Sequence, residues 1–177
     1  MGNKAAFSVP IPAKKEVLGE GPAFHEAICS MLQTARSFEG FGQPELMYLA
    51  KHMRAYRVPA GGTIYREGEK GGYLSVLIEG SISVYKEDSD DQVKFLNLIP
   101  PGSIFGEISV IDSRPTSASL VAESDVVIVD MSRESFLQCV NEDPAFGVRL
   151  ACMVARILCA RLRSASGRLV DYIDVWG

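Results

Sequence analysis

Hydrophobic positions follow a helical period near both ends of the chain and a strand-like pattern between them. After Pro22, apolar residues recur at the i, i+3, i+4, i+7 spacing that is typical of one helix face. A break at Gly40-Phe41-Gly42 is followed by a second helical segment with Pro44 in its first turn. The pattern therefore predicts N-terminal helices within residues 21–53.

Residues 54–131 show the pattern of short strands. Polar and apolar side chains alternate over Ser81–Tyr85, as they do in a half-buried strand, and the pairs Gly61-Gly62 and Gly71-Gly72 mark turns. Turn signals recur roughly every 8–12 residues, which is typical of a sandwich or a barrel. We therefore expect a roll of short strands between two groups of helices.

The helical period returns in residues 132–170. Ser132 is suited to cap a short helix, and Asp143 followed by Pro144 begins a longer one. The apolar face of the longer helix consists of Phe146, Leu150, Met153, Val154, Ile157, Leu158 and Leu162. This face can pack on the protein's own strands.

The first 20 residues have no hydrophobic period, and they mix prolines, lysines and glycines. They are predicted to be a flexible arm, because they show no periodicity. No signal peptide is expected, because no apolar stretch of the required kind lies beside the lysines. Arginines interrupt the long apolar run over residues 146–162, so we interpret it as a packing helix and not as a membrane span.

Charge and chemistry narrow the function further. The 177 residues carry a net charge of -4, and the pI near 5.2 provides no basic footprint for direct contact with nucleic acid. His25 and His52 both precede the strands, and the four cysteines form no CxxC pair. A metal site, a cupin-type metalloenzyme and a hydrolase are therefore not expected. We interpret the cysteines as buried, reduced thiols, as expected in a cytoplasmic protein. We expect no enzyme activity and no cofactor.

Two segments together carry a recognisable signature. The first consists of residues 62–69 (GTIYREGE) and 73–85 (YLSVLIEGSISVY), and the second of residues 102–110 (GSIFGEISV) and 117–122 (SASLVA). They resemble the cyclic-nucleotide-binding domain shared by bacterial catabolite activators, protein kinase A regulatory subunits and cyclic-nucleotide-gated channels. The resemblance covers residues 40–165 and implies a mainly β fold, a jelly-roll-like β-roll (double-stranded β-helix) with flanking helices.

In that family the second segment is the phosphate-binding cassette. The resemblance implies ligand contacts at Phe105, Gly106, Glu107, Ile108, Ser109, Arg114, Thr116, Ser117 and Ala118. Gly106 would let the backbone approach the ligand, and Glu107 would accept a hydrogen bond from the ribose 2′-hydroxyl. The amides of Ile108 and Ser109, at the start of a short helix, would face the cyclic phosphate.

One position departs from the family pattern. The arginine that neutralises the phosphate falls on Thr116, whose hydroxyl brings no charge. A hydrogen bond to a charged group contributes roughly 1.5–3 kcal/mol, so the loss could weaken binding by about ten- to a hundredfold. Arg114 lies two residues upstream, on the same side of an extended segment, and can reach the same anion. It can equally be a solvated loop charge.

The sequence therefore predicts a regulatory domain that binds cyclic AMP or cyclic GMP, with weaker affinity than a complete cassette would have. The alternative is a degenerate member of the family that binds no nucleotide and serves as a protein–protein interaction or dimerisation module. The C-terminal helices of the family lie over the ligand and often form the dimer seam, so the resemblance implies that the segment 144–165 covers the ligand, forms a homodimer or contacts another protein. Many bacterial members append a DNA-binding helix-turn-helix, and we expect none here, because the sequence ends at Gly177, shortly after the long helix.

Overall fold

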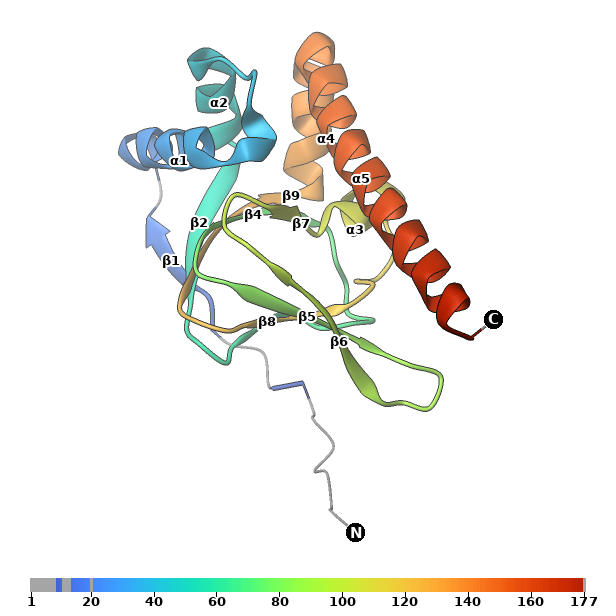
Figure 1. The fold of residues 1–177 in the computed structure, drawn as a ribbon. Helices are drawn as coiled ribbons and strands as arrows, with labels where there is room; N and C mark the ends of the chain where they lie inside the picture. Colours follow the sequence, from blue (N-terminus) through green and yellow to red (C-terminus); the bar gives the residue numbers. More distant parts are fainter. Residues whose placement is uncertain (1–8, 11–13, 20, 177) are drawn as a thin grey trace.

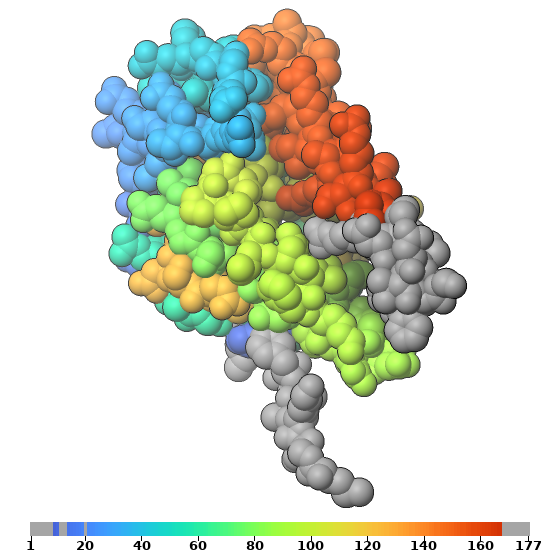
Figure 2. Space-filling view, in the orientation of Figure 1, coloured from blue at the N-terminus to red at the C-terminus, as the bar shows by residue number. Residues whose placement is uncertain are grey.

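Two antiparallel sheets pack face to face in one half of the molecule, and helices from both ends of the chain gather in the other half (Figure 1). Figure 2 shows the same grouping, with the blue and cyan N-terminal segments beside the orange C-terminal one. The computed structural model describes residues 9–10, 14–19 and 21–176, with side chains described as far as residue 167. The predicted fold class, mainly β with flanking helices, is confirmed.

The strands form one sheet with the order β1-β2-β9-β4-β7 and a second with the order β3-β8-β5-β6. Their bounds are β1 (Glu16–Gly19), β2 (Met53–Val58), β3 (Thr63–Tyr65), β4 (Tyr73–Glu79), β5 (Ile82–Glu87), β6 (Val93–Ile99), β7 (Ile104–Phe105), β8 (Ser119–Ala122) and β9 (Val126–Ser132). Because β8 and β9 pair with strands of different sheets, the segment between them links the two layers of the roll.

The helices lie before, within and after this roll. Their bounds are α1 (Pro22–Thr34), η1 (Arg36–Phe38), α2 (Gln43–Ala50), α3 (Glu107–Asp112), α4 (Arg133–Glu142) and α5 (Pro144–Trp176). The predicted cap at Ser132 is confirmed, since its side chain accepts a hydrogen bond from the Ser135 amide. The amide of Phe146 likewise donates to the Asp143 carboxylate at 3.0 Å, as the start of the long helix predicted.

Two hydrophobic clusters hold these layers together. One lies between the helices and the five-stranded sheet and includes Leu49 and Leu150, both fully buried. The other lies between the two sheets and includes Leu77, Ile82 and Phe105. Phe105 comes directly before α3, so the core of the roll fixes the point at which this short helix begins.

The long helix α5 leaves the helical core about halfway along its described side chains. Its residues Phe146, Leu150 and Val154 are buried, whereas Leu162 is 68% exposed. The prediction that the packed apolar face extends to Leu162 is therefore wrong. Beyond the core, α5 passes α3 and runs alongside the open side of the roll (Figure 1), which brings its later residues near the cassette.

The N-terminal segment differs from the predicted flexible arm. Residues Glu16–Gly19 form strand β1, which pairs with β2 at the edge of the five-stranded sheet. Lys15 forms an ion pair with the buried Asp130 on β9, at 2.8 Å. A tertiary contact thus orders this segment, and no periodicity within the segment itself could have revealed it. The rest of the predicted arm lies mostly outside the described residues.

The four cysteines are free thiols, and they differ in exposure. Cys29 and Cys139 are buried thiols, as predicted, while Cys152 and Cys159 are exposed on α5 and contradict that interpretation. Within the part of the chain that the structure describes, no helix is both long enough and apolar enough to cross a membrane.

Candidate functional site

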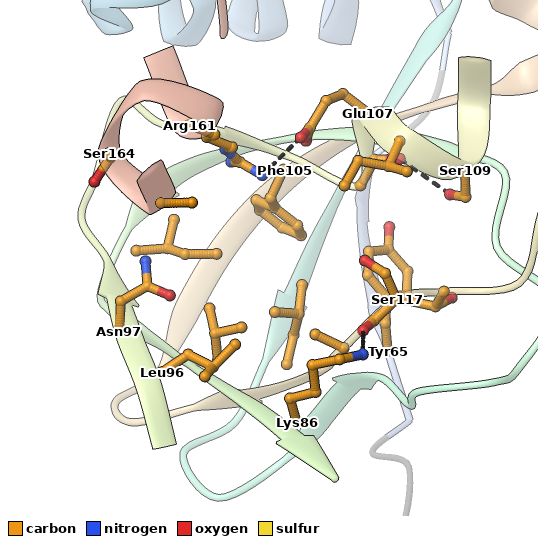
Figure 3. A pocket seen from close by; sticks show the side chains of 18 residues that line it. Tyr65, Lys86, Leu96, Asn97, Phe105, Glu107, Ser109, Ser117, Arg161 and Ser164 are labelled. Atoms are coloured by element: carbon orange, nitrogen blue, oxygen red, sulfur yellow. Dashed lines mark hydrogen bonds and ion pairs between the residues drawn. The ribbon is translucent and has the colours of Figure 1, made fainter. Parts of the chain in front are cut away.

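A cavity of about 690 Å³ opens between the four-stranded sheet, the cassette and α5 (Figure 3). Apolar side chains of the sheets and cassette line much of its wall, and these are Val84, Leu96, Ile99, Phe105 and Leu120. Polar groups come from β5 and β6, from the cassette and from α5. Eight of the nine residues predicted to contact a ligand line this cavity, and the exception is Arg114.

Gly106 sets the turn at which the chain passes from β7 into α3. Its φ angle of 77° lies in the left-handed region, where a side chain is strained. A Cβ atom at this position would also lie 2.3 Å from the carbonyl oxygen of Tyr73 on β4. Both observations require glycine, and they explain how the backbone comes to border the cavity here.

The side chain of Ser109 stabilises the first turn of α3. The Ser109 hydroxyl, which is buried, donates to the Gly106 carbonyl at 3.0 Å and accepts from the Gly72 amide at 3.1 Å. This hydroxyl therefore ties α3 to the turn before β4. Ile108 lines the cavity and is 38% exposed.

Glu107 forms an ion pair with an arginine of α5. Its carboxylate is fully buried, and its Oε1 atom accepts from Nη1 of Arg161 at 2.6 Å (Figure 3). Nη2 of Arg161 donates to the carbonyl of Ile104 at 2.7 Å. Burial raises the pKa of Glu107 above its ordinary value, and the charge of Arg161 partly opposes this shift. The carboxylate's Oε2 is also buried, and it has no hydrogen-bond partner within the described part of the chain.

Thr116, at the position of the family's arginine, is bonded to a neighbouring loop. Its amide and its hydroxyl donate to the carbonyl of Glu69, at 2.9 and 3.2 Å, and its carbonyl accepts from the Gly68 amide. The loop between α3 and β8 is thereby joined to the loop between β3 and β4. Ser117 and Ala118 follow at the cavity wall, and the Ser117 carbonyl accepts from Nζ of Lys86 at 2.8 Å.

Arg114 lies apart from this cavity. It is exposed and lines a separate depression together with Lys70, Arg133 and Glu134. The structure therefore does not bring Arg114 together with the other eight predicted residues. Its contact with a ligand phosphate stays a prediction.

Several lining residues were not singled out from the sequence, and a β-bulge explains two of them. Val84 pairs with Asn97 while Tyr85 pairs with Phe95, which leaves Leu96 unpaired. Leu96 and Asn97 consequently both border the cavity, although adjacent strand residues normally face opposite sides. Lys86, by contrast, follows the alternation of Ile82 and Val84, so that periodicity was the signal that could have found it.

Comparison with known proteins agrees with this architecture. Residues 56–143 match the family model described as "Cyclic nucleotide-binding domain". The chain is 28% identical over 143 residues to a CRP-like cAMP-activated global transcriptional regulator of Mycobacterium tuberculosis, covering 81% of this chain and 62% of that protein. The chain thus spans about three fifths of the length of this relative.

Two solved structures have the same fold as this chain. A cyclic nucleotide-binding domain from Methylobacillus flagellatus superposes with a TM-score of 0.78 at 27% identity, covering 89% of each chain. The regulatory subunit of a cAMP-independent protein kinase A from Trypanosoma brucei shares the fold with a TM-score of 0.67 at 23% identity, over 80% of this chain and 48% of the other. The resemblance noted in the sequence is confirmed.

Proposed function

Because this chain belongs, through residues 56–143, to the cyclic nucleotide-binding domain family, we propose that it is a non-enzymatic regulatory domain that binds cyclic AMP or cyclic GMP in the cavity beside α3. The cavity has the size of a small-molecule site, since such pockets typically measure about 300–1,000 Å³. Its mixture of an apolar wall and a few polar groups suits a nucleotide.

The observation that carries the proposal is the contact between Glu107 and Arg161 inside the cavity. Family resemblance assigns the carboxylate to the ribose hydroxyl. Oε2, which is buried and has no partner among the described residues, is the oxygen left to accept that hydrogen bond while Oε1 keeps the ion pair. A ligand at Glu107 therefore changes the surroundings of an α5 side chain directly. This one carboxylate therefore couples ligand binding to the position of α5, the helix that would carry the signal.

One group of lining residues suits the purine base of the ligand. Leu96, Ile99 and Leu120 provide apolar surface for a purine ring, and Asn97 and Ser164 lie nearby as polar partners for its edge. Selection between adenine and guanine would then depend on the hydrogen bonds that these two residues form.

Isothermal titration of the full chain with cyclic AMP and with cyclic GMP tests the proposal. We expect saturable binding of at least one nucleotide, and a weakening of about tenfold or more in Glu107→Ala, since a hydrogen bond to a charged group is lost. Glu123→Gln, which changes an exposed carboxylate outside the cavity, is the matched control and should bind as the wild type does. No heat and no thermal shift at millimolar ligand would reject nucleotide binding.

The bonding of Thr116 favours a second candidate, a degenerate domain that acts as an interaction module. The hydroxyl at the arginine position is turned toward Glu69, and a fold neighbour is described as part of a cAMP-independent kinase. Exposed apolar residues on α5, such as Val148 at 63% and Leu162 at 68%, would form the contact surface. Sedimentation velocity distinguishes this candidate: a dimer that Val148→Asp dissociates, together with an absence of nucleotide binding, would favour it.

A further inference from the structure

The charged residues that line the cavity lie at two separate places. Arg161 and Glu107 form one ion pair where α5 meets α3, and Lys86 projects from β5 along the cavity toward Ser117 (Figure 3). Among the described lining residues these are the only charged ones, and Lys86 is the cation that takes no part in the ion pair with Glu107.

We propose that Lys86 is the residue that recognises the ligand's phosphate, in place of the charge that Thr116 lacks. This inference rests on the proposed function and assigns the anion-binding end of the same cavity. The singly charged phosphodiester of a cyclic nucleotide is matched by the single positive charge of Lys86.

The position of the Lys86 ammonium supports this assignment. Nζ lies 2.8 Å from the carbonyl oxygen of Ser117, one residue after Thr116. The family's arginine would stem from Thr116, so Lys86 delivers a cation to the same stretch of the cassette from the strand opposite. A lysine ammonium can turn toward a new acceptor, because it has three donors on a flexible stem.

Glu67 holds Lys86 in this place. Its Oε1 accepts from Nζ at 2.6 Å, while its Oε2 accepts from the Glu87 amide at 3.0 Å. The pair is partly exposed, with the Lys86 side chain at 48%, and exposed ion pairs contribute little net stability. A phosphate can therefore share or replace Glu67 as the partner of the ammonium at little cost.

Other nearby cations are committed elsewhere. Arg161 donates to both Glu107 and the Ile104 carbonyl, at the ribose end. Arg114 and Arg133 line the separate depression, and Nε of Arg133 donates to the carbonyl of Val110. Lys86 is thus the cation that the structure places beside the part of the cassette after Thr116.

The experiment titrates wild type, Lys86→Gln, Lys86→Arg and Glu67→Gln with whichever cyclic nucleotide the wild type binds, at several salt concentrations. Lys86→Gln should weaken binding about tenfold or more and flatten its salt dependence, because a charged contact is lost. Lys86→Arg should keep most of the affinity. Glu67→Gln should tighten binding, because it removes the competing carboxylate.

Lys94→Gln is the matched control, since Lys94 lies on the neighbouring strand β6 and is absent from the cavity lining. It should leave the affinity for the nucleotide unchanged. Far-ultraviolet circular dichroism of each variant checks that the fold is retained.

The outcomes separate this inference from the proposed function. If the wild type binds no cyclic nucleotide, the proposed function fails and the assignment of Lys86 fails with it. If the wild type binds and Lys86→Gln binds equally well, only the inference is overturned. A weakening in Lys86→Gln with an unchanged salt dependence would also overturn it, because that result indicates altered packing and not a lost charge.

Discussion

Nη1 of Arg161 on α5 donates to the buried Oε1 of Glu107 on α3 at 2.6 Å, across 54 residues of sequence. The contact joins the helix that follows the roll to the residue that the family resemblance assigns to the ligand. Because one partner is fully buried and the other is 44% exposed, the ion pair lies where the cavity opens to solvent. The site and the helix that would transmit its state are therefore linked before any ligand arrives.

Removal of Arg161 should destabilise the fold. Arg161→Gln leaves the Glu107 carboxylate buried without a countercharge, and such a loss costs about 3–5 kcal/mol for a fully buried pair. The exposure of Arg161 reduces the expected loss to about 2 kcal/mol. Urea denaturation measures it, and a double-mutant cycle with Glu107→Gln isolates the pair. A coupling energy near zero would contradict the prediction.

The buried carboxylate should also make stability depend on pH. The pKa of Glu107 is raised in the folded state by burial, so the folded protein binds this proton more tightly than the unfolded chain does. The contribution of this carboxyl group to the free energy of unfolding is therefore complete below its pKa in the unfolded chain, about 4.3. The contribution is lost as the pH rises through its higher pKa in the folded protein. The stability difference between wild type and Glu107→Gln should therefore decline over this window.

Carbon-13 NMR of the Glu107 carboxyl tests the same relationship directly. Arg161→Gln should raise the pKa of Glu107 further, because the positive charge that opposes the shift is gone. The carboxyl of Glu134, whose pKa is lowered chiefly by a hydrogen bond to its own backbone, is an internal reference that should not move. A fall in the Glu107 pKa on loss of Arg161 would be inconsistent with the ion pair.

Replacement of Gly106 should damage the cassette. Gly106→Ala places a Cβ atom 2.3 Å from the Tyr73 carbonyl in a left-handed conformation, so we expect a loss of about 1–3 kcal/mol in stability and weaker nucleotide binding. Gly167→Ala on α5 is the control: among the described residues, nothing outside the adjoining helix backbone lies within 4 Å of its added Cβ, and the helix should gain up to about 1 kcal/mol. Thermal denaturation compares the two, and equal effects would refute the argument.

The ordered N-terminal segment depends on a lysine held among three tyrosines. Nζ of Lys15 lies 2.8 Å from the Asp130 carboxylate, and 4.6, 5.4 and 5.6 Å from the ring centroids of Tyr65, Tyr56 and Tyr73. Lys15→Met leaves Asp130, whose side chain is 3% exposed, without its countercharge. We expect a loss of about 2–4 kcal/mol in chemical denaturation.

Lys14→Met provides the matched control for this contact, because Lys14 is exposed and adjacent in sequence. It should change stability by less than about 0.5 kcal/mol. Since Tyr65 also lines the nucleotide cavity, Lys15→Met should weaken ligand binding as well. Equal stability of the two variants would show that the contact between Lys15 and Asp130 contributes nothing.

Local sequence patterns predicted those features that depend only on residues a few positions apart. The caps at Ser132 and Asp143 were predictable because each acts on a backbone amide three residues away. Leu162 was misassigned because helical periodicity shows which residues share a face and not how far along the helix a partner surface extends. The bulge at Leu96 was not predictable either, because it depends on the pairing of β6 with β5.

The sequence by itself determined the succession of helices, short strands and helices after residue 20, the turn at Gly106 and the substitution of the cassette arginine by Thr116, because each is encoded within a few adjacent residues. Only the tertiary structure decided which charges meet in the cavity. The pairs Arg161–Glu107 and Lys86–Ser117 join residues 54 and 31 positions apart, and Arg114, only two residues from Thr116, lines a different depression. Side chains distant in sequence are brought together by the packing of whole elements, and no local pattern specifies that packing.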